Sequence, residues 1–189
     1  VLDAPTGEQF QWLTGAADSA DGALRLDNNN LSYLSRGVQS VLGWSLDGGG
    51  VAHGLELGVR YHEDNEDRFQ WKDRYTMRDG TMELFEAGIP GTDSNRVGQT
   101  EALAVYLQDE LRMGRWIVTP SVRYENIDLT RTDYVAAFDG RTQPPTRVRE
   151  SSVSAWMPGL GISWLATDGL TLFSSAHKGF NPPSPGSDA

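Results

Sequence analysis

The chain has 189 residues, of which 38% are hydrophobic and 21 are glycine, and its formal net charge is −10. No run of about 18 apolar residues occurs, so no transmembrane helix is predicted, and the absence of cysteine excludes disulfides and thiolate metal sites. The acidic balance argues against nucleic acid as a partner, because a surface that binds nucleic acid is basic.

The N-terminal segment is predicted to be irregular apart from one short helix. Residues 8–13 can form this helix and end it at Gly15, since glycine accepts the left-handed conformation found at helix C-termini. Residues 16–30 are rich in Asp, Gly, Ala and Asn, which predicts a loop. A first strand is expected over 31–46, and the glycines of 47–50 predict a tight turn after it.

A second strand is expected to start near residue 51, and it alternates cleanly between apolar and polar residues over 54–63. The alternation breaks down over 63–96, where acidic and basic residues mix with scattered aromatic residues. We therefore expect the strand to run on for a short distance and then to give way to a long loop that includes 88–91.

The clearest pattern lies at 102–127, which reads ALAVYLQDELRMGRWIVTPSVRYENI. Both arms alternate with a period of two around a tight turn at 113–115, so a hairpin with one apolar and one polar face is predicted. Each arm is longer than the roughly 9–11 residues that a tilted strand needs to cross a bilayer.

The remaining chain repeats this arrangement. A second long loop is expected at about 130–150, a strand at about 151–166, a tight turn at 167–169 and a strand from 170 to about 178. Residues 181–189 are rich in proline and glycine, which cannot stay in a strand ladder.

Short and long connections thus alternate along the chain, as they do in outer-membrane barrels with short periplasmic turns and long extracellular loops. Trp44, Trp116 and Trp164 each lie beside a short turn and on the face assigned outward. An aromatic girdle at a membrane interface would place them there. The alternative is that tryptophan next to a turn is simply a good sheet residue.

Three stretches resemble the TonB-dependent outer-membrane receptors, and the ferric-citrate-receptor-like branch in particular. They are the hairpin at 102–127, NNNLSYLSRGVQSVLGW at 28–44 and HKGFNPPSPG at 177–186. The resemblance implies a 22-stranded barrel with an N-terminal plug, in the outer membrane of a Gram-negative bacterium. It also implies import of a ferric siderophore or ferric citrate, driven by the TonB energy-coupling protein.

The expected fold is therefore all-β, an antiparallel meander of about six long strands that forms a partial section of a transmembrane β-barrel. Residues 1–189 are expected to be one partial barrel domain, because no plug, energy-coupling box or closing strand is recognisable. Contact with TonB would run through that missing plug region. The residues expected to face outer-membrane lipid are Leu55, Leu57, Val59, Leu103, Val105, Leu107, Val118, Val122, Leu160 and Ile162.

Six charged or titratable side chains are expected to face the polar barrel lumen. They either line a ligand route or contact a plug, or they only pair with one another. These residues are Glu56, Arg60, His62, Glu110, Arg123 and Glu125.

Candidate ligand-binding residues come from the second long loop. Arg131, Arg141, Arg147 and Arg149 can present forked donors to the carboxylates of an anionic ferric chelate, or they only keep the loop soluble. The pair at the end of the last strand, His177 and Lys178, has the same two interpretations.

No motif predicts catalysis, a cofactor or a resident metal. The acidic run at 63–67 lacks the glycine that a calcium loop needs at its sixth position, and no nucleophile elbow, P-loop or dinucleotide fingerprint occurs. A receptor is therefore expected rather than an enzyme. The alternative is a soluble antiparallel β-sandwich that serves as a binding or adhesion module.

Overall fold

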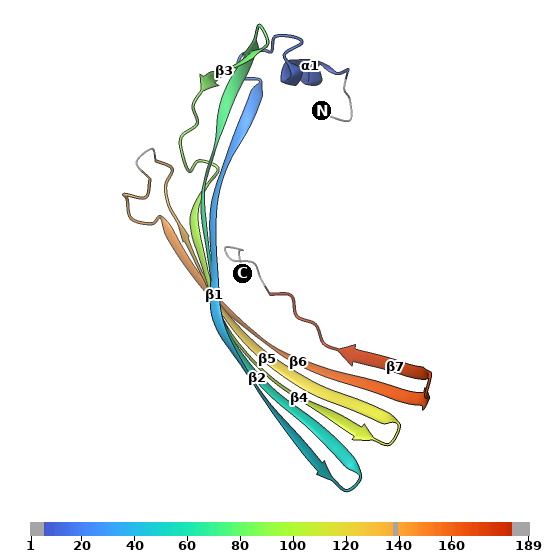
Figure 1. Cartoon of the computed structure of the whole chain (residues 1–189). Coiled ribbons are helices and arrows are strands. Elements are labelled where there is room, and N and C mark those ends of the chain that lie inside the picture. Colours follow the sequence, from blue (N-terminus) through green and yellow to red (C-terminus); the bar gives the residue numbers. More distant parts are fainter. Residues whose placement is uncertain (1–5, 138–139, 183–189) are drawn as a thin grey trace. The chain divides into compact units, whose positions relative to one another are not determined.

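The computed structural model describes residues 6–137 and 140–182. Among these residues, no helix combines the length and apolarity that crossing a bilayer requires. The elements, shown in Figure 1, are α1 (Glu8–Thr14), β1 (Leu24–Gly48), β2 (Val51–Arg78), β3 (Thr81–Glu86), β4 (Ser94–Met113), β5 (Trp116–Asp133), β6 (Arg147–Thr167) and β7 (Leu170–His177).

The seven strands of the described residues form one sheet. Its order is β1-β2-β4-β5-β6-β7, with β3 paired to β2 beside this path. Apart from β3, each strand therefore lies beside the next one along the chain, which confirms the predicted all-β meander (Figure 1). A single sheet does not fit the β-sandwich alternative, which needs two sheets packed face to face.

The predicted tight turns are confirmed at 49–50, 114–115 and 168–169, and they lie at the same end of the strands (Figure 1). The turn after β1 depends on glycine, because Gly49 and Gly50 have φ values of 60° and 82°, where other residues are strained. The predicted helix is confirmed too, and Gly15 ends α1 in the left-handed conformation.

Two segments predicted as loops are strands instead. Residues 24–30 belong to β1, and most of the predicted long loop at 63–96 belongs to β2, to β3 and to the turn at 79–80 between them. Polar side chains pair along these strands: Asn28 Nδ2 donates to Asp73 Oδ2 over 2.7 Å. A strand with polar residues on both faces has no apolar alternation, so periodicity cannot reveal it.

The second predicted long loop is shorter than expected, and its described residues are 134–137 and 140–146. Arg131 lies in β5, and Arg147 and Arg149 lie in β6, so only Arg141 of the predicted loop arginines is in a loop. The final segment behaves as predicted at 181–182, which are outside any strand, while 183–189 lie outside the described residues.

The strands pass through two compact units. The first unit comprises residues 1–33, 66–97 and 132–148, and the second comprises 34–65, 98–131 and 149–189.

In the first unit, the segment after α1 is tied to the β2–β3 hairpin. Ser19 N donates to Met77 O over 3.1 Å, and Met77 N donates to Ser19 Oγ over 2.9 Å. Gly22 N donates to Thr76 Oγ1 over 2.9 Å. These reciprocal bonds fix the segment before β1 onto the hairpin.

The second unit has two distinct faces. Side chains along β4 alternate between exposed and buried over 99–104. Ala102 and Ala104 are buried on one face, here called the inner face, while Leu103 and Leu107 are 44% and 46% exposed on the opposite, outer face. An apolar cluster that the alternation did not predict covers part of the inner face, and its members are Ala102, Ile127, Leu129, Val153 and Phe180.

Gly58 in β2 lies under the ring of Tyr106, whose hydroxyl donates to Glu56. A Cβ atom at residue 58 would overlap that ring, so we expect Gly58→Ala to lower the free energy of unfolding by about 1–3 kcal/mol through overpacking. Gly43→Ala is the matched control, because only a carbonyl oxygen 3.9 Å away faces that position. Urea unfolding of the intact protein measures both, and equal losses would contradict this packing constraint.

Candidate functional site

The β5–β6 hairpin keeps one register over most of its length. Leu165 N donates to Arg115 O over 2.8 Å, and the next pair, Trp116 and Trp164, stacks with ring centroids 5.7 Å apart. Farther along, the rings of Tyr124 and Trp156 are 4.8 Å apart, and Val153 packs against the cluster that contains Ile127. Each step forward along β5 is thus matched by one step back along β6.

Arg131 and Arg149 lie farther along the same two strands, beyond the contacts that fix this register, and at the loop end Thr146 N donates to Asp133 O over 2.8 Å, one residue out of step. Both belong to the second unit. Arg131 is two residues from Leu129, and Arg149 is four residues from Val153, so both share the inner face with this cluster. Both residues also have interactions of their own. Two forked donors on one face of neighbouring strands suit an anion such as a carboxylate.

The other predicted ligand-binding residues lie at separate points of the chain: Arg147 is two residues before Arg149 in β6, Arg141 is in the β5–β6 loop, and His177 and Lys178 are at the end of β7 and directly after it. Arg147 is exposed and Arg141 is bound by Asp67, and both belong to the first unit. His177 lies opposite Gly159 in the β6–β7 pairing. Ten residues along β6 separate Gly159 from Arg149, which is roughly 33 Å of strand.

Five of the six predicted lumen-facing residues have local partners. Tyr106 donates to Glu56, Arg123 Nε donates to Glu125 Oε2 over 3.1 Å, and His62 Nε2 is 3.7 Å from Asp64 Oδ2. Glu110 pairs with Arg112 over 2.7 Å. Pairs of this kind balance charge along the strands, and a role in a ligand route stays a prediction.

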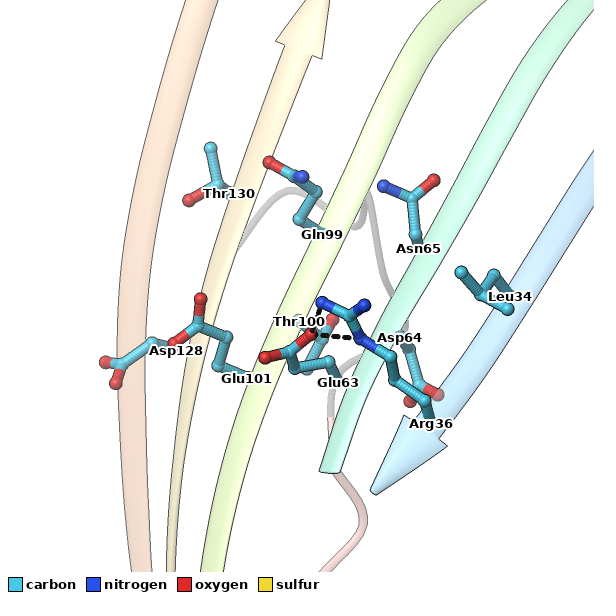
Figure 2. Close-up of a pocket in the computed structure, with 10 residues that line it drawn as sticks. All are labelled: Leu34, Arg36, Glu63, Asp64, Asn65, Gln99, Thr100, Glu101, Asp128 and Thr130. Carbon is cyan, nitrogen blue, oxygen red and sulfur yellow. Dashed lines mark hydrogen bonds and ion pairs between the residues drawn. The ribbon is translucent and has the colours of Figure 1, made fainter. Parts of the chain in front are cut away.

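A polar pocket of about 350 Å³ lies in the second unit between β1, β2, β4 and β5 (Figure 2). Arg36 Nε donates to Glu63 Oε2 over 2.7 Å, and the Tyr61 hydroxyl donates to Glu63 Oε1 over 2.8 Å. Glu101 faces the same pocket from β4, on the outer face that carries Leu103. In the described part of the chain, no group of three His, Cys, Asp or Glu side chains could hold a metal ion.

Two rows of aromatic residues cross the outer face of the β5–β6 hairpin. Trp116 and Trp164 form one row beside the tight turns, and Tyr124 and Trp156 form a second row eight residues farther along each strand. Eight residues of strand span about 27 Å, which a tilt of about 35–45° reduces to roughly 19–22 Å, somewhat less than the apolar band of a membrane barrel, about 25 Å tall. Aliphatic side chains lie between the rows on this face, and they include Val118, Val122, Leu160 and Ile162.

The tryptophans of the first row were predicted from the sequence, and the second row was not. The signal was present in the sequence. Tyr124 lies eight residues after Trp116, and Trp156 lies eight residues before Trp164, so each shares the face of the first-row tryptophan on its own strand.

One antiparallel sheet with an aliphatic outer face, bordered by aromatic rows, and a charged inner face defines a section of a membrane β-barrel. The family model "TonB dependent receptor-like, beta-barrel" matches residues 4–189, and the chain belongs to this family.

Two solved structures show the same fold. The unliganded ferric citrate transporter FecA is 24% identical with a TM-score of 0.61, over 81% of this chain and 21% of FecA. The siderophore receptor PiuA from Acinetobacter baumannii is 13% identical with a TM-score of 0.56, over 77% of this chain and 24% of PiuA. The chain thus spans about a fifth to a quarter of the length of these receptors.

Proposed function

We propose that this chain is part of an outer-membrane receptor of a Gram-negative bacterium that imports a ferric siderophore or ferric citrate. The family match supports a receptor rather than an enzyme. The two solved structures with the same fold are a ferric citrate transporter and a siderophore receptor. Energy for import would come from the TonB protein, which is a further proposed partner. The observation that carries the ligand class is that Arg131 and Arg149 share the inner face with Ile127, Leu129 and Val153 on the neighbouring strands β5 and β6.

The outer face is proposed to meet outer-membrane lipid. Leu103 and Leu107 are about half exposed, and exposed aliphatic side chains of this density need an apolar solvent or a partner surface. The aromatic rows on the β5–β6 hairpin would then lie at the two lipid–water interfaces.

A charge placed on this face tests the membrane assignment. Val105 lies between Leu103 and Leu107, and we expect Val105→Lys to cost about 2–4 kcal/mol of folding stability in a bilayer if the residue is near the midplane. Gln108→Lys is the matched control, since residue 108 of the same strand faces the inner side. The measurement is urea-dependent folding of the intact receptor into lipid vesicles. Similar losses for both variants would show that the outer face does not meet lipid.

The proposed ligand is an anionic ferric chelate held by the guanidinium groups of Arg131 and Arg149. Arginine binds carboxylates bidentately, and two arginines on neighbouring strands can bind two carboxylates or share one. Arg147 at the start of β6, and His177 and Lys178 after β7, are proposed as further contacts at separate points of the chain.

Neutralising the pair tests the ligand class. We expect Arg131→Gln and Arg149→Gln each to raise the Kd for ferric citrate, and each lost charge-assisted hydrogen bond to contribute about tenfold or more. Arg36→Gln removes the same charge from the outer face and serves as the control. The affinity is measured by titrating ferric citrate into the purified intact receptor. Unchanged binding in the double variant would leave the two arginines as structural residues.

A further inference from the structure

Arg141 makes the most extensive set of side-chain contacts in the first unit. Its Nη1 donates to Asp67 Oδ2 over 2.7 Å and its Nη2 to Asp67 Oδ1 over 2.6 Å, which is a bidentate ion pair with β2. Its Nε donates to Asn95 Oδ1 of β4 over 2.8 Å. One side chain in the β5–β6 loop thus holds two strands through three charge-assisted hydrogen bonds.

Further contacts occupy most of the remaining hydrogen-bond donors of this guanidinium. Nη2 lies 3.1 Å from Arg68 O and 3.2 Å from Arg96 O, and the group lies over the rings of Phe69 and Tyr134 at 5.9 and 4.9 Å. The side chain is only 21% exposed. A guanidinium has five N–H donors, so few donors remain for a ligand.

The backbone of the loop is fastened around the same point. Tyr134 N donates to Asn95 O over 2.9 Å, and Ala137 N donates to Pro90 O over 3.1 Å. The side-chain amide of Asn95 donates to Val135 O over 2.5 Å while its oxygen accepts from Arg141. Asn95 therefore connects the arginine to the loop that carries it.

We propose that Arg141 is a positioning residue, which through Asp67 holds the described parts of the β5–β6 loop, residues 134–137 and 140–146, in one conformation for ligand binding. The loop begins three residues after Arg131 and ends three residues before Arg149, so it joins the two strands that carry the arginine pair. A loop fixed before the ligand arrives avoids the entropic cost of ordering it on binding. This role rests on the proposed function and reassigns Arg141 from ligand contact to support.

A double-mutant cycle in the intact receptor tests this role. Arg141→Gln, Asp67→Asn and the double variant are compared for their ferric citrate Kd, their binding capacity and the hydrogen exchange of the Tyr134 and Ala137 amides. Each single variant should speed exchange roughly tenfold and raise the Kd at unchanged capacity, because the loop opens locally while the receptor stays folded. The double variant should be no worse than Arg141→Gln alone, since both changes remove one coupled interaction.

Arg25→Gln is the control, because it removes the same charge from an exposed pair with Asp27 in the same unit. Additive losses of affinity in the double variant would overturn the proposal, and so would tighter binding by Asp67→Asn, which would mean that Asp67 competes with the ligand for Arg141. If the unmodified receptor binds no ferric citrate, the proposed function fails for that ligand. The exchange rates then still decide whether Arg141 and Asp67 hold the loop.

Discussion

The strict alternation of side chains between two faces of one hydrogen-bonded sheet is the constraint on which the second unit depends. On β4 it separates buried alanines from exposed leucines, and on β5 and β6 it separates the inner-face cluster from the aromatic rows. The backbone satisfies its own hydrogen bonds along the ladder, so each face is free to match its own surroundings. Shifting one strand by a single residue would exchange the two faces completely.

Apolar periodicity predicted those parts of the fold in which the two faces differ in polarity. The hairpin at 102–127, the three tight turns and the helix that ends at Gly15 were all predicted, because alternation and glycine positions are local signals. The continuation of β2 and the whole of β3 were missed. Residues such as Asn28 and Asp73 stabilise these strands by polar pairing, and no local pattern distinguishes such pairs from a solvated loop.

The arginines show the same division between local and long-range information. Their residue types pointed to anion binding, and alternation along β5 and β6 could in principle have placed Arg131 and Arg149 on one face. The partners of Arg141 could not have been predicted, since Asp67 and Asn95 are 74 and 46 residues away along the chain. These arginines lie close together in the sequence. Only their tertiary contacts distinguish an arginine that supports the structure from one that can bind a ligand.

The polar strands of the first unit have a consequence for how such a protein can diverge. In the second unit an insertion of one residue within a strand would turn leucines inward and charges toward the outer face. In the polar part of β1 and β2, where Asn28 pairs with Asp73 and Gln70 with Asn29, both faces accept similar side chains. Register is weakly specified in strands of this kind, so residues can be gained or lost there at small cost. Related receptors are therefore expected to differ in length chiefly in this part of the sheet, while the strands beside the tight turns keep a constant length.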